Sequence, residues 1–170
     1  MKKLLILLFS IFATIFPPAT TLFAEPESGK VTVAVGDVKV IAKAGDAPVA
    51  IKAGDKVAIG SAIKTGAGAR AVVVITSRSA IRIAENSEVV LEVIDETVLP
   101  KKVTIDLKDG SLSALLKPNA AGELDFQVRT PSGVAAARGT FFSVAVKDGK
   151  GFAQVKEGRV DVIPAAKAGQ

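Results

Sequence analysis

The 170-residue sequence contains no cysteine, histidine, tryptophan or tyrosine, and phenylalanine is its only aromatic residue. Without cysteine and histidine the chain cannot form a Cys/His zinc site, a haem–histidine bond, a disulfide, or a Ser-His-Asp or Cys-His catalytic group. Any catalysis would depend on Asp/Glu pairs, Lys, Ser or Thr. The sequence indicates no cofactor and no metal site, and we expect the chain not to be an enzyme.

The N-terminus has the layout of a secretory signal peptide. A short basic start precedes an apolar run from Leu4 to Phe16, and the small Ala24 precedes a polar stretch. We expect residues 1–24 to be cleaved off after Ala24, which would leave a periplasmic or secreted chain with no stable membrane span. The alternative is an uncleaved membrane anchor, although this run is shorter than the ~20 residues that a span needs.

Beyond the leader, apolar and polar residues alternate with a period of two. The alternating runs are 31–35, 81–83, 103–107, 124–128, 142–146 and 160–162. Successive residues of a strand point to opposite faces, so each run predicts a strand with one buried face. Ala71 to Ile75 is apolar throughout and predicts a central strand covered on both faces. Asp148-Gly149, between two such runs, predicts a hairpin.

These patterns predict an all-β domain of many short antiparallel strands, arranged as a β-sandwich or jelly roll or as a β-solenoid. We expect a short linker at 25–30, the all-β domain at 31–163 and a flexible tail at 164–170. No helix is expected after the leader.

Two motifs have both a chemical and a structural interpretation. Gly-Asp recurs at 36–37, 45–46 and 54–55, a period of nine that resembles calcium-binding β-rolls but lacks their dense glycine pattern. We favour one turn per repeat. Ser61 and Lys64 match the Ser-x-x-Lys pattern of acyl-enzymes. Because residues i and i+3 of a strand face opposite ways, we interpret this match as chance.

Charge is distributed unevenly along the chain. Residues 29–84 carry 9 basic and 3 acidic side chains, residues 85–128 carry 4 and 9, and residues 129–170 carry 7 and 3. This indicates either a bipolar surface for a partner or for self-association, or solvated strand faces, and we favour the second. We expect no nucleic-acid partner, because the chain has no Tyr or Trp on which bases could stack.

The segment 130–144 is the densest in unusual residues. Pro131 and Gly133 predict a turn after Thr130. Arg138 is a lone charge in an apolar stretch, so it should either extend to solvent or pair with a carboxylate. Thr130, Pro131, Gly133 and Arg138 are therefore the candidate functional surface, and a corner that only defines the fold is the alternative.

This segment resembles the FecR domain family, whose pattern reads V-x-T-P-x-G-x-A-x-x-R-G-T-x-F-x-V. The matching residues are Val128, Thr130, Pro131, Gly133, Ala135, Arg138, Gly139, Thr140, Phe142 and Val144. Other family blocks also appear in order along the chain, and the resemblance covers about Val31 to Ile163. At Ser77-Arg78-Ser79 the chain departs from the family's usual Asp-Gly-Ser turn.

The resemblance implies a periplasmic all-β domain with a binding role and no catalytic residues. FecR-type regulators of iron–siderophore uptake also carry a cytoplasmic anti-sigma segment and a membrane helix, which we do not find here. We therefore expect a stand-alone exported module that engages a protein or another envelope ligand in the periplasm, as a sensory or scaffold element. One alternative is a structural module associated with a cell-wall polymer or polysaccharide. Another is a component of transmembrane signalling linked to a TonB-dependent receptor and an extracytoplasmic sigma factor.

Overall fold

The computed structural model describes residues 28–117, 124–137 and 140–165, which contain strands and no helix. The strands are β1 (Ser28–Val35), β2 (Val38–Ile41), β3 (Val49–Ala50), β4 (Lys56–Ala58), β5 (Ala62–Thr65), β6 (Arg70–Thr76), β7 (Ser79–Ile83), β8 (Ser87–Asp95), β9 (Lys101–Leu116), β10 (Leu124–Thr130), β11 (Gly133–Ala137), β12 (Phe141–Lys147), β13 (Lys150–Glu157) and β14 (Val160–Pro164). The predicted all-β class is confirmed. Over the same ranges no helix long and apolar enough to cross a membrane is found.

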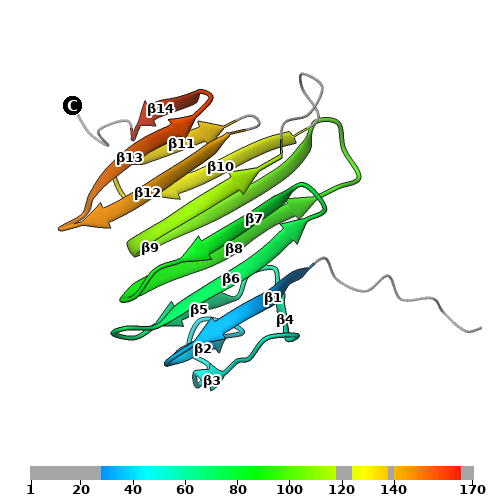
Figure 1. The fold of residues 1–170 in the computed structure, drawn as a ribbon, viewed down its shortest axis with the longest axis vertical. Helices are drawn as coiled ribbons and strands as arrows, with labels where there is room; N and C mark the ends of the chain where they lie inside the picture. The colour runs from blue at the N-terminus through cyan, green and yellow to red at the C-terminus, as the bar shows by residue number, and fades with distance from the viewer. Residues whose placement is uncertain (1–27, 118–123, 138–139, 166–170) are drawn as a thin grey trace, which may run out of the picture.

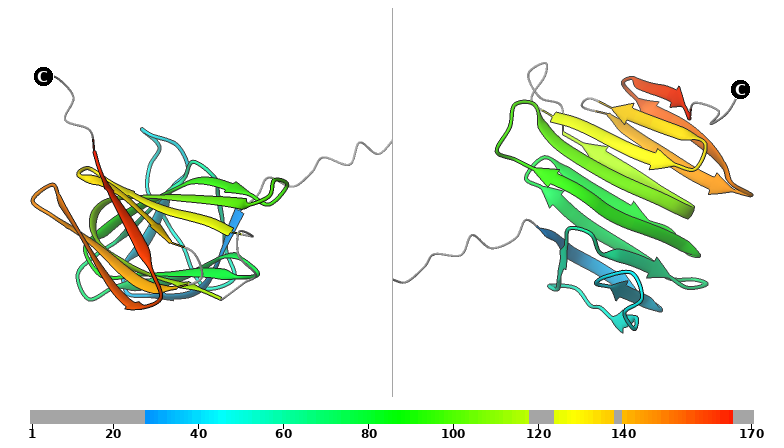
Figure 2. Two further views of the ribbon diagram at one scale, coloured as in Figure 1. Left: turned by 90° about the horizontal axis from the view of Figure 1, so that it is seen from above. Right: turned by 180° about the vertical axis from the view of Figure 1, so that it is seen from behind.

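The strands form two facing layers that share β9, as the view from above in Figure 2 shows. Sheet A has the strand order β4-β1-β6-β7-β9-β12-β13, and sheet B has the order β3-β2-β5-β8-β9-β10-β11-β14. The arrangement is a sandwich. Its chain also advances steadily along the long axis, from β1–β4 at one end to β12–β14 at the other (Figure 1).

The long strand β9 passes from one layer to the other at Gly110. Its residues up to Asp109 pair with β8 in sheet B, and those from Gly110 onward pair with β7 and β12 in sheet A. Gly110 has a φ of 80°, and a Cβ there would lie 2.5 Å from the carbonyl oxygen of Asn86. Glycine therefore permits both the bend in β9 and the close approach of the segment that contains Asn86.

One pairing departs from the antiparallel pattern. β10 runs parallel to β9, with Leu124 opposite Lys101 and Arg129 opposite Asp106. Because β9 turns into sheet A at Gly110, its end returns to the side of the sandwich where it began. The chain re-enters sheet B on that same side, so β10 must run in the direction of the first half of β9.

The core lies between the sheets and consists of their inward-facing apolar side chains. Phe126 of β10 and Phe142 of β12, both fully buried, meet edge to face with ring centroids 6.2 Å apart. This aromatic pair joins sheet B to sheet A. The prediction that Ala71 to Ile75 is covered on both faces was wrong: Val73 is fully buried but Val74 is 36% exposed, because no other described residues cover that face of sheet A.

The predicted turns are present. Asp148 and Gly149 have φ angles of 52° and 70°, and together they form the tight turn between β12 and β13. In the Gly-Asp repeat, the Asp46 carboxylate accepts a hydrogen bond from the Lys43 amide (3.0 Å), and Asp55 accepts one from Lys52 (2.9 Å). The turn interpretation is confirmed. The described residues contain no group of three side chains that could hold a metal ion.

Candidate functional site

The C-terminal end of the sandwich is formed by two edge strands. Sheet A ends with β13, which pairs only with β12, and sheet B ends with β14, which pairs only with β11. The outer edges of both strands have no strand partner within the described residues. We call this end, consisting of β13 and β14, the open end.

Most inward-facing side chains at the open end are exposed. Val155 lies opposite the buried Phe142, and Val162 lies opposite the buried Ala135. Directly opposite residues of paired strands point to the same face, so both valines point toward the core side of their sheets. Val155 is nevertheless 41% exposed and Val162 is 62% exposed. The described chain therefore leaves this end of its core uncovered.

Between the two edge strands lies a hollow of about 110 Å³. It is lined by Thr130, Ser132, Gly133, Val134, Ala135, Val144, Gly151, Phe152, Ala153, Val162 and Pro164. Most of these residues are apolar, and the hydroxyl groups come from the turn between β10 and β11. The hollow suits a small apolar side chain that has a hydrogen-bonding group beside it.

The candidate residues Thr130, Pro131 and Gly133 form the hairpin between β10 and β11. Thr130 Oγ1 donates a hydrogen bond to the Gly133 carbonyl (2.9 Å). At the tip, the Gly151 amide of β13 donates to Ser132 Oγ (2.6 Å), which connects sheet A to sheet B. Thr130 and Gly133 line the hollow, whereas Pro131 lies in the exposed turn.

Packing explains why Gly133 is a glycine. A Cβ at this position would clash with the Ile163 carbonyl oxygen and lie 3.0 Å from Pro164 Cα. The residue therefore allows β14 to approach β11 closely. Arg138, the fourth candidate, lies outside the described residues.

Sequence reasoning missed the exposed apolar residues of the open end. These are Phe152, Val155, Val162 and Ile163. The available signal was that Phe152-Ala153 breaks the alternation of apolar and polar residues near the C-terminus. Strand order decides whether such residues are buried or exposed, and the sequence did not define it.

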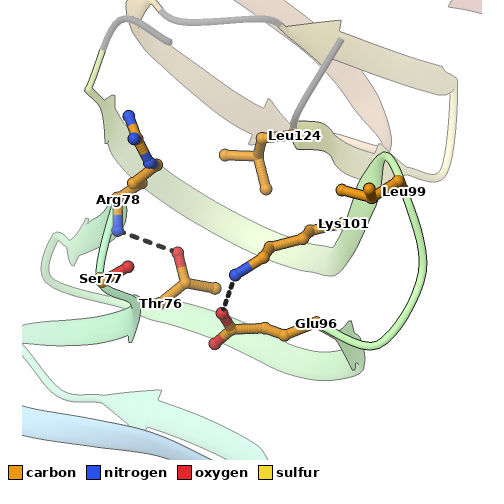
Figure 3. Close-up of a pocket in the computed structure, with 7 residues that line it drawn as sticks. All are labelled: Thr76, Ser77, Arg78, Glu96, Leu99, Lys101 and Leu124. Carbon is orange, nitrogen blue, oxygen red and sulfur yellow. Dashed lines mark hydrogen bonds and ion pairs between the residues drawn. The ribbon is translucent and has the colours of Figure 1, made fainter. Parts of the chain in front are cut away.

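A larger hollow, of about 370 Å³, opens at one side of the sandwich (Figure 3). It is lined by Thr76, Ser77, Arg78, Glu96, Leu99, Lys101 and Leu124. These residues come from the turn between β6 and β7, the loop between β8 and β9, and the start of β10. Lys101 Nζ lies 2.8 Å from Glu96 Oε2, and Leu99 is 82% exposed. In the sequence, the only sign of this hollow was the departure from the family's usual turn at Ser77-Arg78-Ser79.

Among the residues that the structure describes, two ionisable groups have shifted pKa values, and both shifts favour the charged form. Hydrogen bonds from the hydroxyl and amide of Thr97 lower the pKa of the Asp95 carboxyl group below its ordinary value. A hydrogen bond to Asp106 raises the pKa of Lys108 above its ordinary value. A general acid or a neutral lysine nucleophile requires shifts in the opposite directions.

Ser61 and Lys64 do not form a catalytic pair. Ser61 is buried and its hydroxyl lies 3.4 Å from the Ala42 carbonyl oxygen, whereas Lys64 is directed outward and pairs with Glu88 at 2.9 Å. The interpretation of this motif as a chance match agrees with its geometry.

Comparison with known proteins gives one match. The family model described as FecR protein matches residues 61–161, which is more than half of the chain and includes most of both sheets. The chain belongs to the FecR family. FecR membership associates it with signalling at the cell envelope. No curated protein and no solved structure matches this FecR chain.

Proposed function

We propose that this chain is a non-enzymatic binding module of the periplasm, exported by a signal peptide at residues 1–24. It acts as a sensory or scaffold element by engaging another envelope protein. The partner contributes an extended segment that adds to the sheets at the open end. The observation that carries this proposal is the pair of unpartnered edge strands, β13 and β14, with exposed valines on their inward faces.

Strand addition fits the chemistry of an open sheet edge. The backbone N–H and C=O groups along such an edge are a template for another strand, and neighbouring pockets select its side chains. Here the hollow of about 110 Å³ lies between the two edges and would accept one side chain of an added strand. Backbone pairing would supply affinity, and this hollow would supply selectivity.

The edge strands differ in how well they are protected. Natural edges avoid unwanted pairing by being short or by carrying Lys or Pro. β3 has only 2 residues, and Pro164 ends β14, which removes one backbone donor. β13 has 8 residues, and its charged residues lie toward its ends, leaving 151–155 uncharged. β13 is therefore the edge at which we expect a partner strand to pair.

Photo-crosslinking in intact cells tests this proposal. A crosslinking amino acid replaces Phe152, which is 59% exposed at the open end, or Val49, which is 61% exposed at the opposite end. We expect a discrete crosslinked species with a second envelope protein from position 152 and none from position 49. A second variant, Val162→Lys, adds an inward-pointing charge at the open end and should abolish that species.

Three results would contradict the proposal. They are equal crosslinking from positions 152 and 49, a crosslink from position 152 only to a second copy of this chain, and a crosslink that persists in Val162→Lys. Because Val162 is already exposed, the lysine variant should remain folded, and a thermal melt of the purified protein checks this.

A further inference from the structure

The two sheets differ sharply in charge. The strands of sheet A, with β9 counted from Gly110, carry seven basic residues and one acidic residue. The strands of sheet B, with β9 counted up to Asp109, carry six basic and seven acidic residues. The unevenness along the sequence is thus also a difference between the two faces of the sandwich.

On the outer face of sheet B most basic residues have acidic partners. Lys64 pairs with Glu88 at 2.9 Å, and Arg129 pairs with Glu92 at 2.8 Å. Such pairs satisfy the charges within the molecule itself. This face therefore offers little net attraction to an external anion.

On the outer face of sheet A three cations, Lys30, Arg70 and Arg82, are not neutralised in this way. Lys30, Arg70 and Arg82 are exposed, and each lies opposite an outward-facing valine of the neighbouring strand. Within the described ranges none of the three forms an ion pair. Their positive charge is directed to solvent, where it attracts anions.

An apolar band crosses the same face. Val74, Ala80, Leu115 and Phe141 are successive opposite neighbours on β6, β7, β9 and β12. Leu115 is 55% exposed, and a shallow hollow of about 140 Å³ beside it has Arg78 and Lys117 among its lining residues. Lys30 adjoins the Val74 end of the band, and Lys156 Nζ lies 5.3 Å from the Phe141 ring centroid at the other end. Apolar side chains and cations therefore lie side by side on the outer face of sheet A.

We propose that the outer face of sheet A docks on the surface of a membrane that contains anionic phospholipids. Such a surface offers negative headgroups to the lysines and arginines, and an apolar layer directly beneath them to Leu115 and Val74. A soluble polyanion would match the cations but would leave the apolar band without a partner. The membrane is therefore the occupant that matches both features, and docking on it leaves the open end accessible to a protein.

Vesicle flotation tests the proposal with a charge-matched control. The protein is purified after export from its full-length gene and mixed with vesicles that contain phosphatidylglycerol or with vesicles of phosphatidylcholine alone. The test variant is Lys30→Gln/Arg70→Gln/Arg82→Gln. The control, Lys39→Gln/Lys64→Gln/Arg129→Gln, removes the same charge from sheet B.

We expect the native protein and the control variant to float with phosphatidylglycerol vesicles and not with phosphatidylcholine vesicles. Each basic residue near an anionic membrane strengthens binding by about five-fold, so the test variant should bind about a hundred-fold more weakly. Leu115→Ser, which removes an exposed apolar side chain from the band, should weaken binding several-fold. Val162→Lys should float like the native protein, because membrane docking does not use the open end.

The proposal would be overturned if the two triple variants lost binding to phosphatidylglycerol vesicles equally. It would also be overturned if the native protein floated equally well with phosphatidylcholine vesicles. Binding to soluble heparin without flotation, weakened in the test variant and unchanged in Leu115→Ser, would also overturn it and would identify an anionic polymer as the partner. None of the substituted residues is buried, and circular dichroism of each variant checks that the fold is intact.

Discussion

The two ends of the sandwich are built alike but are covered differently. Each end finishes with two edge strands, β3 and β4 at one end and β13 and β14 at the other. Val57 of β4 lies opposite the buried Gly29 and is 1% exposed, whereas Val162 of β14 lies opposite the buried Ala135 and is 62% exposed. Both valines point inward from an edge strand, so the difference comes from what lies beyond them.

A loop closes the N-terminal end. Between β3 and β4 the chain crosses from sheet B to sheet A, and on the way the Ile51 amide donates a hydrogen bond to the Val38 carbonyl (3.0 Å). Further along, Gly54 donates to Val31 (2.8 Å), and the side chain of Ile51 packs against the core. We call this the closed end. The comparison shows that the protein covers its own core at one end and leaves it accessible at the other, where we place the partner.

The largest expected effect comes from placing a charge at these matched positions. Val57→Asp would bury an unpaired carboxylate, which should lower the free energy of unfolding by at least about 3 kcal/mol. Small domains have a total stability of about 5–15 kcal/mol, so this variant should be mostly unfolded under mild denaturing conditions. Val162→Asp should change the stability by no more than about 0.5 kcal/mol, because the side chain remains in water.

Urea titrations of the two variants, followed by circular dichroism, measure this difference. Similar midpoints for Val57→Asp and Val162→Asp would show that the two ends are equally covered, and would remove the basis for treating the C-terminal end as a binding surface. If Val162→Asp were destabilised while Val57→Asp kept the stability of the unmodified protein, the C-terminal end would be the better covered of the two.

A smaller effect is expected where glycine permits close packing at each end. A Cβ on Gly29 would lie 2.7 Å from Val73 Cγ1 and 3.1 Å from Leu91 Cδ1 in the core. Gly29→Ala should therefore cost about 1–3 kcal/mol through overpacking. A Cβ on Gly151 would lie 2.6 Å from Ser132 Oγ and 2.7 Å from Thr130 Oγ1, the two hydroxyl oxygens of the β10–β11 hairpin. The expected loss comes from the hydrogen bonds of these hydroxyls and is about 1 kcal/mol.

Thermal melts of Gly29→Ala and Gly151→Ala test this ordering. Equal shifts in Tm would indicate that the tip of the β10–β11 hairpin is packed as tightly as the core. The further variant Ser132→Ala removes the hydroxyl from the Gly151 contact. If it has the same Tm as Gly151→Ala, the lost hydrogen bond accounts for the effect.

Local pattern was sufficient to predict several of the strands and turns of this fold, but not all of its elements. The alternation at 103–107 and 124–128 correctly indicated strands with one buried face, and Asp148-Gly149 correctly indicated a tight turn. These signals are local because side-chain direction and turn geometry depend on neighbouring residues. The passage of β9 between sheets and the parallel pairing of β10 depend on contacts distant in sequence. Alternation contains no information about them.

The candidate site was predicted only in part for the same reason. Thr130 and Gly133 stand out in the sequence, and both line the hollow at the open end. Val155 and Val162 look like ordinary core residues, and they become a candidate binding surface only because β13 and β14 are the last strands of their sheets. The exposure of Val74 was missed likewise, because an apolar run does not reveal that one face of its sheet is uncovered.

The last comparison concerns threonine hydroxyls near the two ends. Thr65, opposite Val38, is 6% exposed; its hydroxyl donates to the Ala84 carbonyl (2.6 Å) and accepts from the Ser87 amide (3.0 Å). Thr65→Val would leave that buried amide without a partner, at a cost of about 1–3 kcal/mol. Thr130→Val removes the bond to the Gly133 carbonyl and a longer contact with Ser132 Oγ (3.4 Å), both of which water can replace, so its cost should be about 0.5 kcal/mol. Hydrogen exchange distinguishes the two, because only Thr65→Val should accelerate exchange of the Ser87 amide. If Thr130→Val is as destabilising as Thr65→Val, then Thr130 stabilises the corner of the fold and is not part of a partner-binding surface.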